Sequence, residues 1–274
     1  MKYFTDGIHE VEFKNKTAFK VLSQNMRYLK DRSEVIVVFS AAVSKRSLRK
    51  PPFFSGKGMA KDVKVPMISI SDPSLEADDI LSLGWYAGSS TNLELQHQIR
   101  EFLNSLLASL SRIVLMGGSG GGFAALTQAF LLSNSKVNCL VWNPQTSISM
   151  YNPKYVNRYL NVCFNIFSNS EDSSVLYSKL DSTGCIHSLL SLEIPSAGRI
   201  VYLQNESDRH LQLHAVPFLK KFLGGYNFER SIITRKGDLQ LDFICENFSE
   251  GHKPPTKEVI ISYLTNFIGD DIIK

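Results

Sequence analysis

The chain has 274 residues, of which 43% are hydrophobic and 20% are charged. This composition is typical of a globular protein, and we expect one large domain over residues 1–274 rather than two small ones. Stretches of about 18 apolar residues are absent, which predicts no membrane span. The first residues also lack the apolar core of a secretory signal, so a cytoplasmic protein is expected. Four scattered cysteines without metal-ligand spacing predict neither a disulfide framework nor a metal site.

The net charge of +4 is small, and the main basic cluster is the short segment 44–50. This segment lacks the interleaved aromatic residues of a nucleic-acid surface, so no nucleic-acid partner is expected. A solvated loop is the simpler interpretation. The alternative is an anion-binding rim on a substrate pocket, and its candidate residues are Lys45, Arg46, Arg49 and Lys50.

Apolar strands and amphipathic helices alternate along the chain. An antiparallel edge hairpin is expected within residues 3–14. Apolar runs rich in β-branched residues predict buried strands at 35–39, 65–70, 112–116, 137–142 and 199–203, and a later strand-like segment at 239–244. Apolar periodicity predicts helices at 96–109, 123–132, 215–223 and 257–268. This alternation predicts an α/β fold, a mainly parallel sheet with helices on both faces.

Residues 147–196 interrupt the alternation. The segment is expected to be partly helical and is polar between Ser168 and Ser174. Long insertions of this kind often form a lid or one wall of a pocket, so a lid or pocket wall is predicted here.

A glycine-rich run surrounds Ser119, in the order Gly117-Gly118-Ser119-Gly120-Gly121-Gly122. It follows a predicted strand and precedes a helix expected to start near Gly122, which is the context of a nucleophile elbow. The glycines allow a strained turn to pack against its neighbours, and the amides at the start of the helix suit a developing oxyanion. The run therefore predicts Ser119 as a nucleophile.

Other interpretations of the run are weaker. A P-loop needs Gly-Lys-Ser/Thr at the end of the run, but Phe123 and Ala124 follow instead. The spacing of Gly120, Gly122 and Ala125 fits a loose dinucleotide fingerprint, yet the acidic residue expected about 20 positions later is absent. A purely structural glycine turn is a further alternative.

The partners of a serine nucleophile on such an elbow follow it in the order acid, then histidine. The strand at 199–203 leads to Glu206 and Asp208, and the shorter side chain of Asp208 would hold an imidazole more rigidly. His252 follows a strand-like segment late in the chain, between Gly251 and two prolines, whereas His210 lies very near the acid. Asp208 and His252 are therefore the predicted partners.

Small residues after the first central strand suit the other half of an oxyanion hole. The backbone amides of Ala41 or Ala42, together with that of Gly120, are the predicted donors. In this scheme His252 takes the proton of Ser119 and Asp208 holds the imidazolium.

The same motifs resemble one branch of the α/β-hydrolase family. That branch includes bacterial capsule O-acetyltransferases and the acyltransferase-like domain of an accessory secretion component. The matching segments begin at Pro51, Ile70, Gly84, Gly117, Trp142, Gln204 and Gly251 and together span residues 35–268. The resemblance supports Asp208 over Glu206 and His252 over the other histidines.

The resemblance also implies a function. It implies acyl transfer or ester hydrolysis on a bacterial surface carbohydrate or glycoconjugate, without a bound cofactor and with acetyl-CoA as a possible acyl donor. It places Trp85 and Gln145 among the substrate-binding candidates and allows a homo-oligomer or a biosynthetic complex. Water and a sugar hydroxyl both remain open as acyl acceptors. The alternative is a non-catalytic protein of the same fold that binds glycan or a partner.

Overall fold

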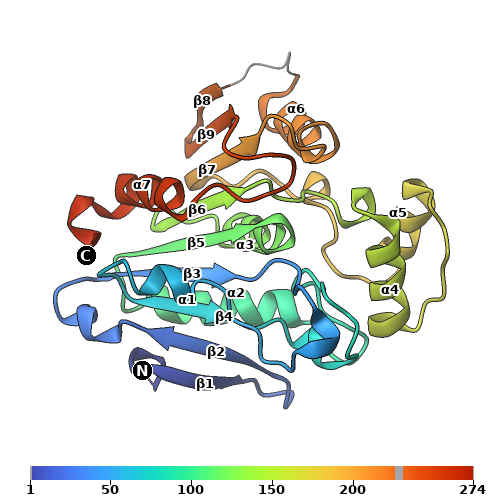
Figure 1. Cartoon of the computed structure of the whole chain (residues 1–274), viewed down its shortest axis with the longest axis horizontal. Helices are drawn as coiled ribbons and strands as arrows, with labels where there is room; N and C mark the ends of the chain where they lie inside the picture. The colour runs from blue at the N-terminus through green and yellow to red at the C-terminus, as the bar shows by residue number, and fades with distance from the viewer. Residues whose placement is uncertain (1, 226–230, 274) are drawn as a thin grey trace.

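The computed structural model describes residues 2–225 and 231–273. Within these residues one nine-stranded sheet has the order β1-β2-β4-β3-β5-β6-β7-β9-β8 (Figure 1). The central strands from β4 to β9 are parallel to their neighbours, and β1, β2 and β8 pair antiparallel at the two edges. The strands are β1 (Gly7–Glu12), β2 (Ala18–Gln24), β3 (Glu34–Phe39), β4 (Met67–Ile70), β5 (Arg112–Gly118), β6 (Val137–Trp142), β7 (Ala197–Asn205), β8 (Ser231–Lys236) and β9 (Asp238–Glu246).

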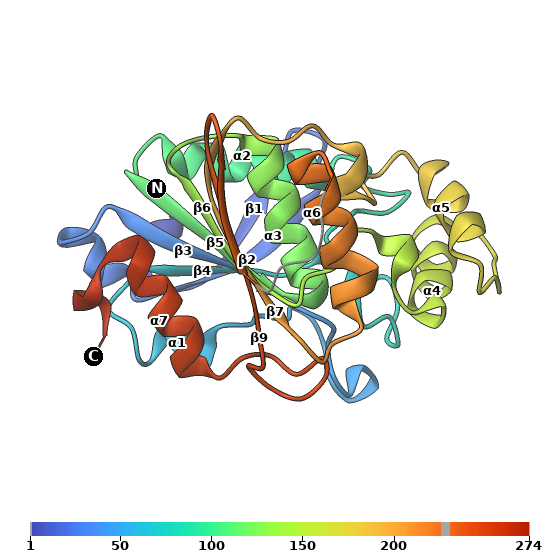
Figure 2. The same cartoon turned by 90° about the horizontal axis from the view of Figure 1, so that it is seen from above.

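Helices cover both faces of the sheet (Figure 2). They are α1 (Lys57–Ala60), α2 (Leu95–Leu107), α3 (Ser119–Leu132), α4 (Pro153–Phe164), α5 (Ser173–Asp181), α6 (Val216–Leu223) and α7 (Lys257–Ile268). One face packs against α1 and α7, and the other against α2, α3 and α6. Successive residues of β3 illustrate the two cores, because Val37 belongs to one apolar cluster and Val38 to the other. The predicted doubly covered, mainly parallel sheet is therefore confirmed.

The insertion between β6 and β7 carries α4 and α5, which stand beside the sheet (Figures 1 and 2). Helix α4 begins where the side chain of Asn152 accepts the Lys154 N–H and Pro153 occupies the first turn. Its apolar residues Val156 and Leu160 are fully buried. The partly helical insertion predicted at 147–196 is thus present. None of the helices within the described ranges is long and apolar enough to cross a membrane.

The edge hairpin differs from the prediction. It is formed by β1 and β2, and the turn lies at residues 13–17 instead of inside residues 3–14. The Phe13 N–H donates to the Thr17 carbonyl at 3.0 Å, and Lys16 has the left-handed φ of 64°. The prediction placed both strands before this turn because the Asn15-Lys16 turn was not recognised.

Candidate active site

Ser119 sits on a sharp turn between β5 and α3. Its φ of 51° lies in the left-handed region, which is unusual for a residue with a side chain and marks backbone strain. The surrounding glycines are required by close packing. A Cβ on Gly121 would lie 2.5 Å from the Phe39 carbonyl oxygen, and one on Gly117 would lie 2.4 Å from that of Gly121. The predicted elbow geometry is present, although α3 begins at Ser119 itself instead of near Gly122.

A chain of hydrogen bonds joins Ser119, His252 and Asp208. The Nδ1 atom of His252 lies 2.6 Å from Oδ2 of Asp208, and its Nε2 lies 2.9 Å from Oγ of Ser119. An ionised carboxylate only accepts, so Nδ1 carries the proton and Nε2 offers its lone pair to the Ser119 hydroxyl. The three predicted residues follow β5, β7 and β9, whose carboxyl ends meet at one edge of the sheet.

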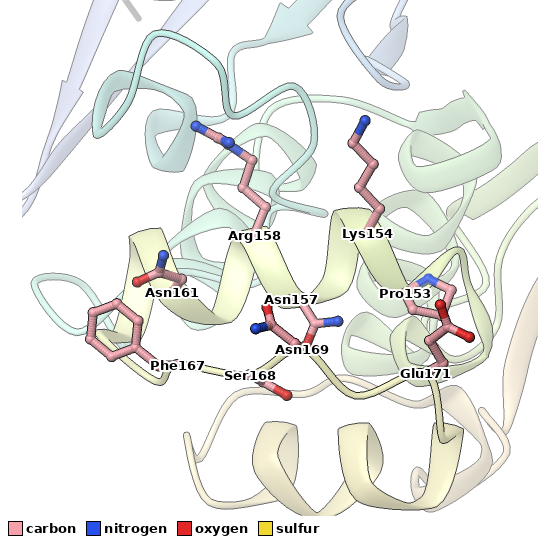
Figure 3. A pocket seen from close by; sticks show the side chains of 9 residues that line it. All are labelled: Pro153, Lys154, Asn157, Arg158, Asn161, Phe167, Ser168, Asn169 and Glu171. Carbon is pink, nitrogen blue, oxygen red and sulfur yellow. The ribbon is translucent and has the colours of Figure 1, made fainter.

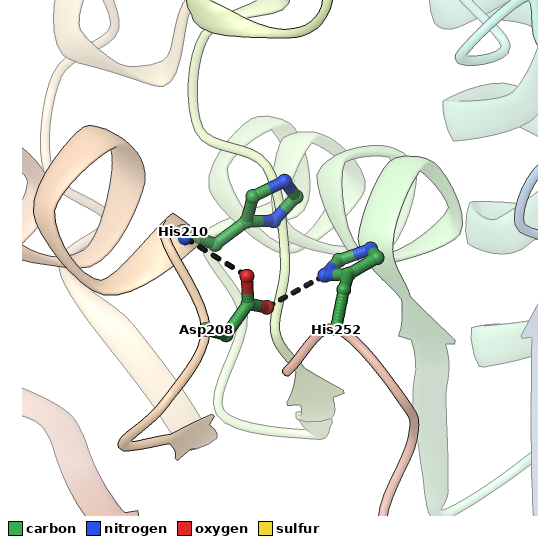
Figure 4. Close-up of side chains that lie close together, drawn as sticks. All are labelled: Asp208, His210 and His252. Carbon is green, nitrogen blue, oxygen red and sulfur yellow. Dashed lines mark hydrogen bonds and ion pairs between the residues drawn. The ribbon is translucent and has the colours of Figure 1, made fainter. Parts of the chain in front are cut away.

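Asp208 is buried, whereas the His252 side chain is 39% exposed. Burial raises the pKa of the Asp208 carboxyl, but its hydrogen bond from His252, that from the His210 amide and the two nearby imidazoles hold this pKa below its ordinary value. Oδ1 of Asp208 accepts the His210 N–H at 3.0 Å, and both bonds are drawn in Figure 4. Asp208 therefore stays ionised at neutral pH beside His252. Glu206, its rival in the sequence, is exposed.

Two asparagines tie the loops of the relay together. Oδ1 of Asn143 accepts the Asn205 N–H at 2.7 Å, and Nδ2 of Asn143 donates to the Lys253 carbonyl at 3.1 Å. Nδ2 of Asn205 donates to the Gly251 carbonyl at 2.5 Å. The segment that carries His252 is thereby fixed to the ends of β6 and β7. No role was predicted for these asparagines from the sequence.

His210 lies against His252, with ring centroids 4.1 Å apart (Figure 4). Its Nδ1 lies 3.1 Å from the carbonyl oxygen of Asn143, which can only accept, so Nδ1 is protonated. Burial, together with the charge of His252, lowers the pKa of His210 to about 4. His210 is therefore a neutral ring at pH 7 that supports one face of His252.

Among the described residues, one group has the composition of a metal site, namely Asp208, His210 and His252. One ligand atom from each lies within 4.8 Å of the others. Both carboxylate oxygens of Asp208 already accept hydrogen bonds from the other two residues. Since His252 also contacts Ser119, the hydrogen-bonded relay accounts for this cluster without an ion.

Gln145 contacts the side chain of Ser119. Its Nε2 donates to Oγ of Ser119 at 3.1 Å, and its Oε1 accepts the indole N–H of Trp85. Gln145 is fully buried and Trp85 is 1% exposed. Both residues were predicted to bind substrate, but neither lines the cavity at Ser119. They support the serine instead, because the indole fixes which end of the amide faces Oγ.

In the loop after β3, the backbone amides of Ala41 and Ala42 are the candidates for binding an oxyanion, and the amides on either side of them already have partners. The Ser40 N–H donates to the Tyr86 hydroxyl at 2.7 Å, and the Val43 N–H donates to the Ser82 carbonyl at 2.8 Å. Ala41 and Ala42 lie between these two anchored amides and line the cavity with Ser119. Gly120 follows Ser119 in the first turn of α3, where amides have no partner within the helix. Ala41 and Ala42 therefore lie at the cavity beside Ser119, and Gly120 adjoins Ser119 in the chain.

A cavity of about 400 Å³ opens at Ser119. Apolar side chains from both the sheet and the helices form most of its wall. Its lining includes Val38, Met59, Met116, Tyr151, Pro254 and Ile260. Tyr151 belongs to the insertion, so the insertion supplies part of this wall.

The basic segment 44–50 lies elsewhere, and none of its four cations lines this cavity. Arg46 is buried, and its guanidinium donates to carbonyl oxygens at 2.7–3.0 Å; the acceptors are Leu75, Asp78, Leu81 and Arg49. Lys50 pairs with Asp79 at 3.1 Å. Arg46 therefore holds loops together, and it fits neither the solvated loop nor the alternative of an anion-binding rim. Lys45 and Arg49 are exposed.

A separate hollow of about 380 Å³ lies along α4 (Figure 3). Amide and hydroxyl side chains line it together with the exposed ring of Phe167, and Arg158 and Lys154 stand at its edge. Arg158 is already paired with Asp78 at 3.0 Å. No residue of the Ser119 relay contributes to this hollow.

No family model matches the sequence, and no curated protein matches it either. Solved structures do match. The capsule O-acetyltransferase of Neisseria meningitidis serogroup A has a TM-score of 0.58 and 14% identity, covering 96% of this chain and 95% of that one. An S-formylglutathione hydrolase from Agrobacterium tumefaciens has a TM-score of 0.55 and 12% identity, covering 95% and 92%.

The glycosylation-associated protein complex Gap123 of Streptococcus agalactiae is also similar, with a TM-score of 0.56 and 16% identity. That match covers 96% of this chain and 47% of the other. At identities this low, the structural matches establish a common fold only. The predicted resemblance to capsule O-acetyltransferases is confirmed at that level, and the chain has the α/β-hydrolase fold.

Proposed function

We propose that this protein is a serine acyltransferase or esterase that works through an acyl-Ser119 intermediate. The observation that carries the proposal is the continuous hydrogen-bonded chain from Asp208 through His252 to Ser119. A buried carboxylate, a correctly protonated imidazole and a strained serine at the start of a helix are the parts that nucleophilic acyl transfer needs. A protein that only binds glycan or a partner would not need them in this geometry.

The first half of the reaction follows from the atoms in contact. Oγ of Ser119 bonds to the carbonyl carbon of the acyl donor while its proton passes to Nε2 of His252. Asp208 stabilises the imidazolium, and the amides of Gly120 and of Ala41 or Ala42 stabilise the oxyanion. The bond to the leaving group then breaks, and His252 returns the proton to that group.

The second half regenerates the serine. An acceptor hydroxyl gives its proton to His252 and attacks the acyl-Ser119 carbonyl, and the proton returns to Oγ when the ester bond breaks. We propose a carbohydrate hydroxyl as the acceptor, with acetyl-CoA among the donors to be tested. The support for a carbohydrate is the fold shared with a capsule O-acetyltransferase.

Acid-quenched intact-mass measurement after exposure to p-nitrophenyl acetate tests the intermediate. We expect one acyl group on the native protein, located at Ser119 by peptide mapping, and none on the Ser119→Ala variant. Adding an oligosaccharide then distinguishes transfer, which yields an acylated sugar, from hydrolysis, which yields only the free acid. A native protein that p-nitrophenyl esters of every chain length leave unmodified at Ser119 would contradict the proposal, whichever acceptor is supplied.

A further inference from the structure

The cavity at Ser119 has an apolar wall that the relay does not use. Val38 on β3 and Met116 on β5 supply it from the sheet, while Met59 on α1 and Ile260 on α7 supply it from the helices. All four side chains belong to the apolar cluster between the sheet and these two helices. The cavity is therefore bordered by side chains of that cluster on the side of the sheet that α1 and α7 cover.

The size of the cavity exceeds what an acetyl group needs. Its volume of about 400 Å³ corresponds to about a dozen water molecules at roughly 30 Å³ each. An acetyl group on Ser119 would leave most of the apolar wall without a contact. A chain of several methylene groups would cover it.

The positions of His252 and of the apolar wall indicate where the two ends of a substrate bind. His252 must stand beside the leaving group or acceptor, because it gives or takes that group's proton. Tyr151 lies at that end because its ring contacts the ring of His210, which lies against His252, and Pro254 follows His252 by two residues. Met59 and Met116, which come from the apolar cluster, are then left for the acyl chain.

We propose that Ser119 carries an unbranched acyl group of about four to eight carbons, with its chain in the apolar cavity bounded by α1 and α7. This inference rests on the proposed acyl-enzyme and names the acyl class that it takes. Each methylene buried there should raise kcat/KM about fourfold until the cavity is filled.

The test is the burst of p-nitrophenolate from p-nitrophenyl esters of two, four, six, eight and ten carbons, which reports acylation without any acceptor. We expect kcat/KM for acylation to rise at least tenfold from the acetate to the best ester, and to fall again at ten carbons. A profile that is highest for the acetate would overturn the inference and leave the proposed function intact. A lack of Ser119-dependent acylation at every length would instead refute the proposed function.

Two neighbours on α7 offer matched variants. Ile260 lines the cavity and Ile261 does not, although both are buried, at 5% and 8% exposure. Ile260→Phe should lower the octanoate-to-acetate ratio of kcat/KM at least fivefold, and Ile260→Ala should move the optimum to longer chains. Ile261→Phe and Ile261→Ala should keep the native ratio. Equal octanoate-to-acetate ratios in the native protein and all four variants would overturn the placement of the acyl chain. The ester profile of the native protein tests the chain length even where a variant fails to fold.

Discussion

The indole N–H of Trp85 binds the side-chain carbonyl of Gln145, so the amide nitrogen of Gln145 faces Ser119. Both side chains are buried, and the amide cannot turn over without losing both hydrogen bonds. This pair gives Oγ a second hydrogen-bond neighbour besides His252. The nucleophile is therefore held by two neighbours, one that donates to it and one that accepts its proton.

We expect Gln145→Leu to slow acylation of Ser119 about tenfold, the value of one lost hydrogen bond of ordinary strength. Trp85→Phe removes the indole N–H and should slow acylation by a similar factor, because the amide can then present either end. Burst kinetics with a p-nitrophenyl ester measure both effects. Together the two changes should cost little more than either one, since they break the same contact. Native rates in either folded single variant would show that the pair does not position the serine.

The stability of the protein should fall in acid because of His210. Its ordinary pKa of 6.5 is lowered to about 4 in the folded state, so the unfolded chain binds the extra proton between these values. The contribution of the neutral His210 to the free energy of unfolding is fully present above pH 6.5 and is lost as the pH falls through about 4. The loss in stability is on the order of 3 kcal/mol. The charged or titratable groups that affect His210 are Asp208, Arg209 and His252, and the ring of His214 contacts its ring edge to face.

Urea unfolding at pH 7, 5.5 and 4.5 measures this loss. The native protein should lose stability steadily over that range, and His210→Gln should lose less, since a glutamine takes up no proton. His214 should cause part of the remaining loss, because burial lowers its pKa as well. If the stability of the native and His210→Gln proteins depended on pH in the same way, His210 would be excluded as a cause of the loss of stability in acid.

The sequence predicted the central strands because buried parallel strands are nearly continuous apolar runs, as residues 137–142 of β6 are. β8 was missed because most of its residues are exposed and carry no such pattern. The triad was predictable from chain order, since each partner follows a strand. Gln145 and Asn143 were not assigned correctly, because polar residues of this kind become buried only through contacts far along the chain, such as that of Asn143 with Lys253.

Arg46 is a charged residue whose burial could likewise not be predicted from the sequence. Within a basic segment it is indistinguishable from Lys45, yet its guanidinium is buried among carbonyl oxygens. We expect Arg46→Met to lower the free energy of unfolding by about 3 kcal/mol, because those carbonyls lose a charged donor. Lys45→Met, at an exposed neighbour, should change it by less than about 0.5 kcal/mol. Chemical denaturation compares the two, and equal small effects would mean that Arg46 does not join the loops.

Labelling with a fluorophosphonate probe tests the central claim most directly, because this reagent reacts with a serine only when a base activates it. We expect one label on Ser119 in the native protein. Ser119→Ala should abolish the label, and His252→Ala should slow it by at least a hundredfold while leaving the fold intact by circular dichroism. Absence of label on the folded native protein, or a label that persists in Ser119→Ala, would contradict the assignment of Ser119 as the nucleophile.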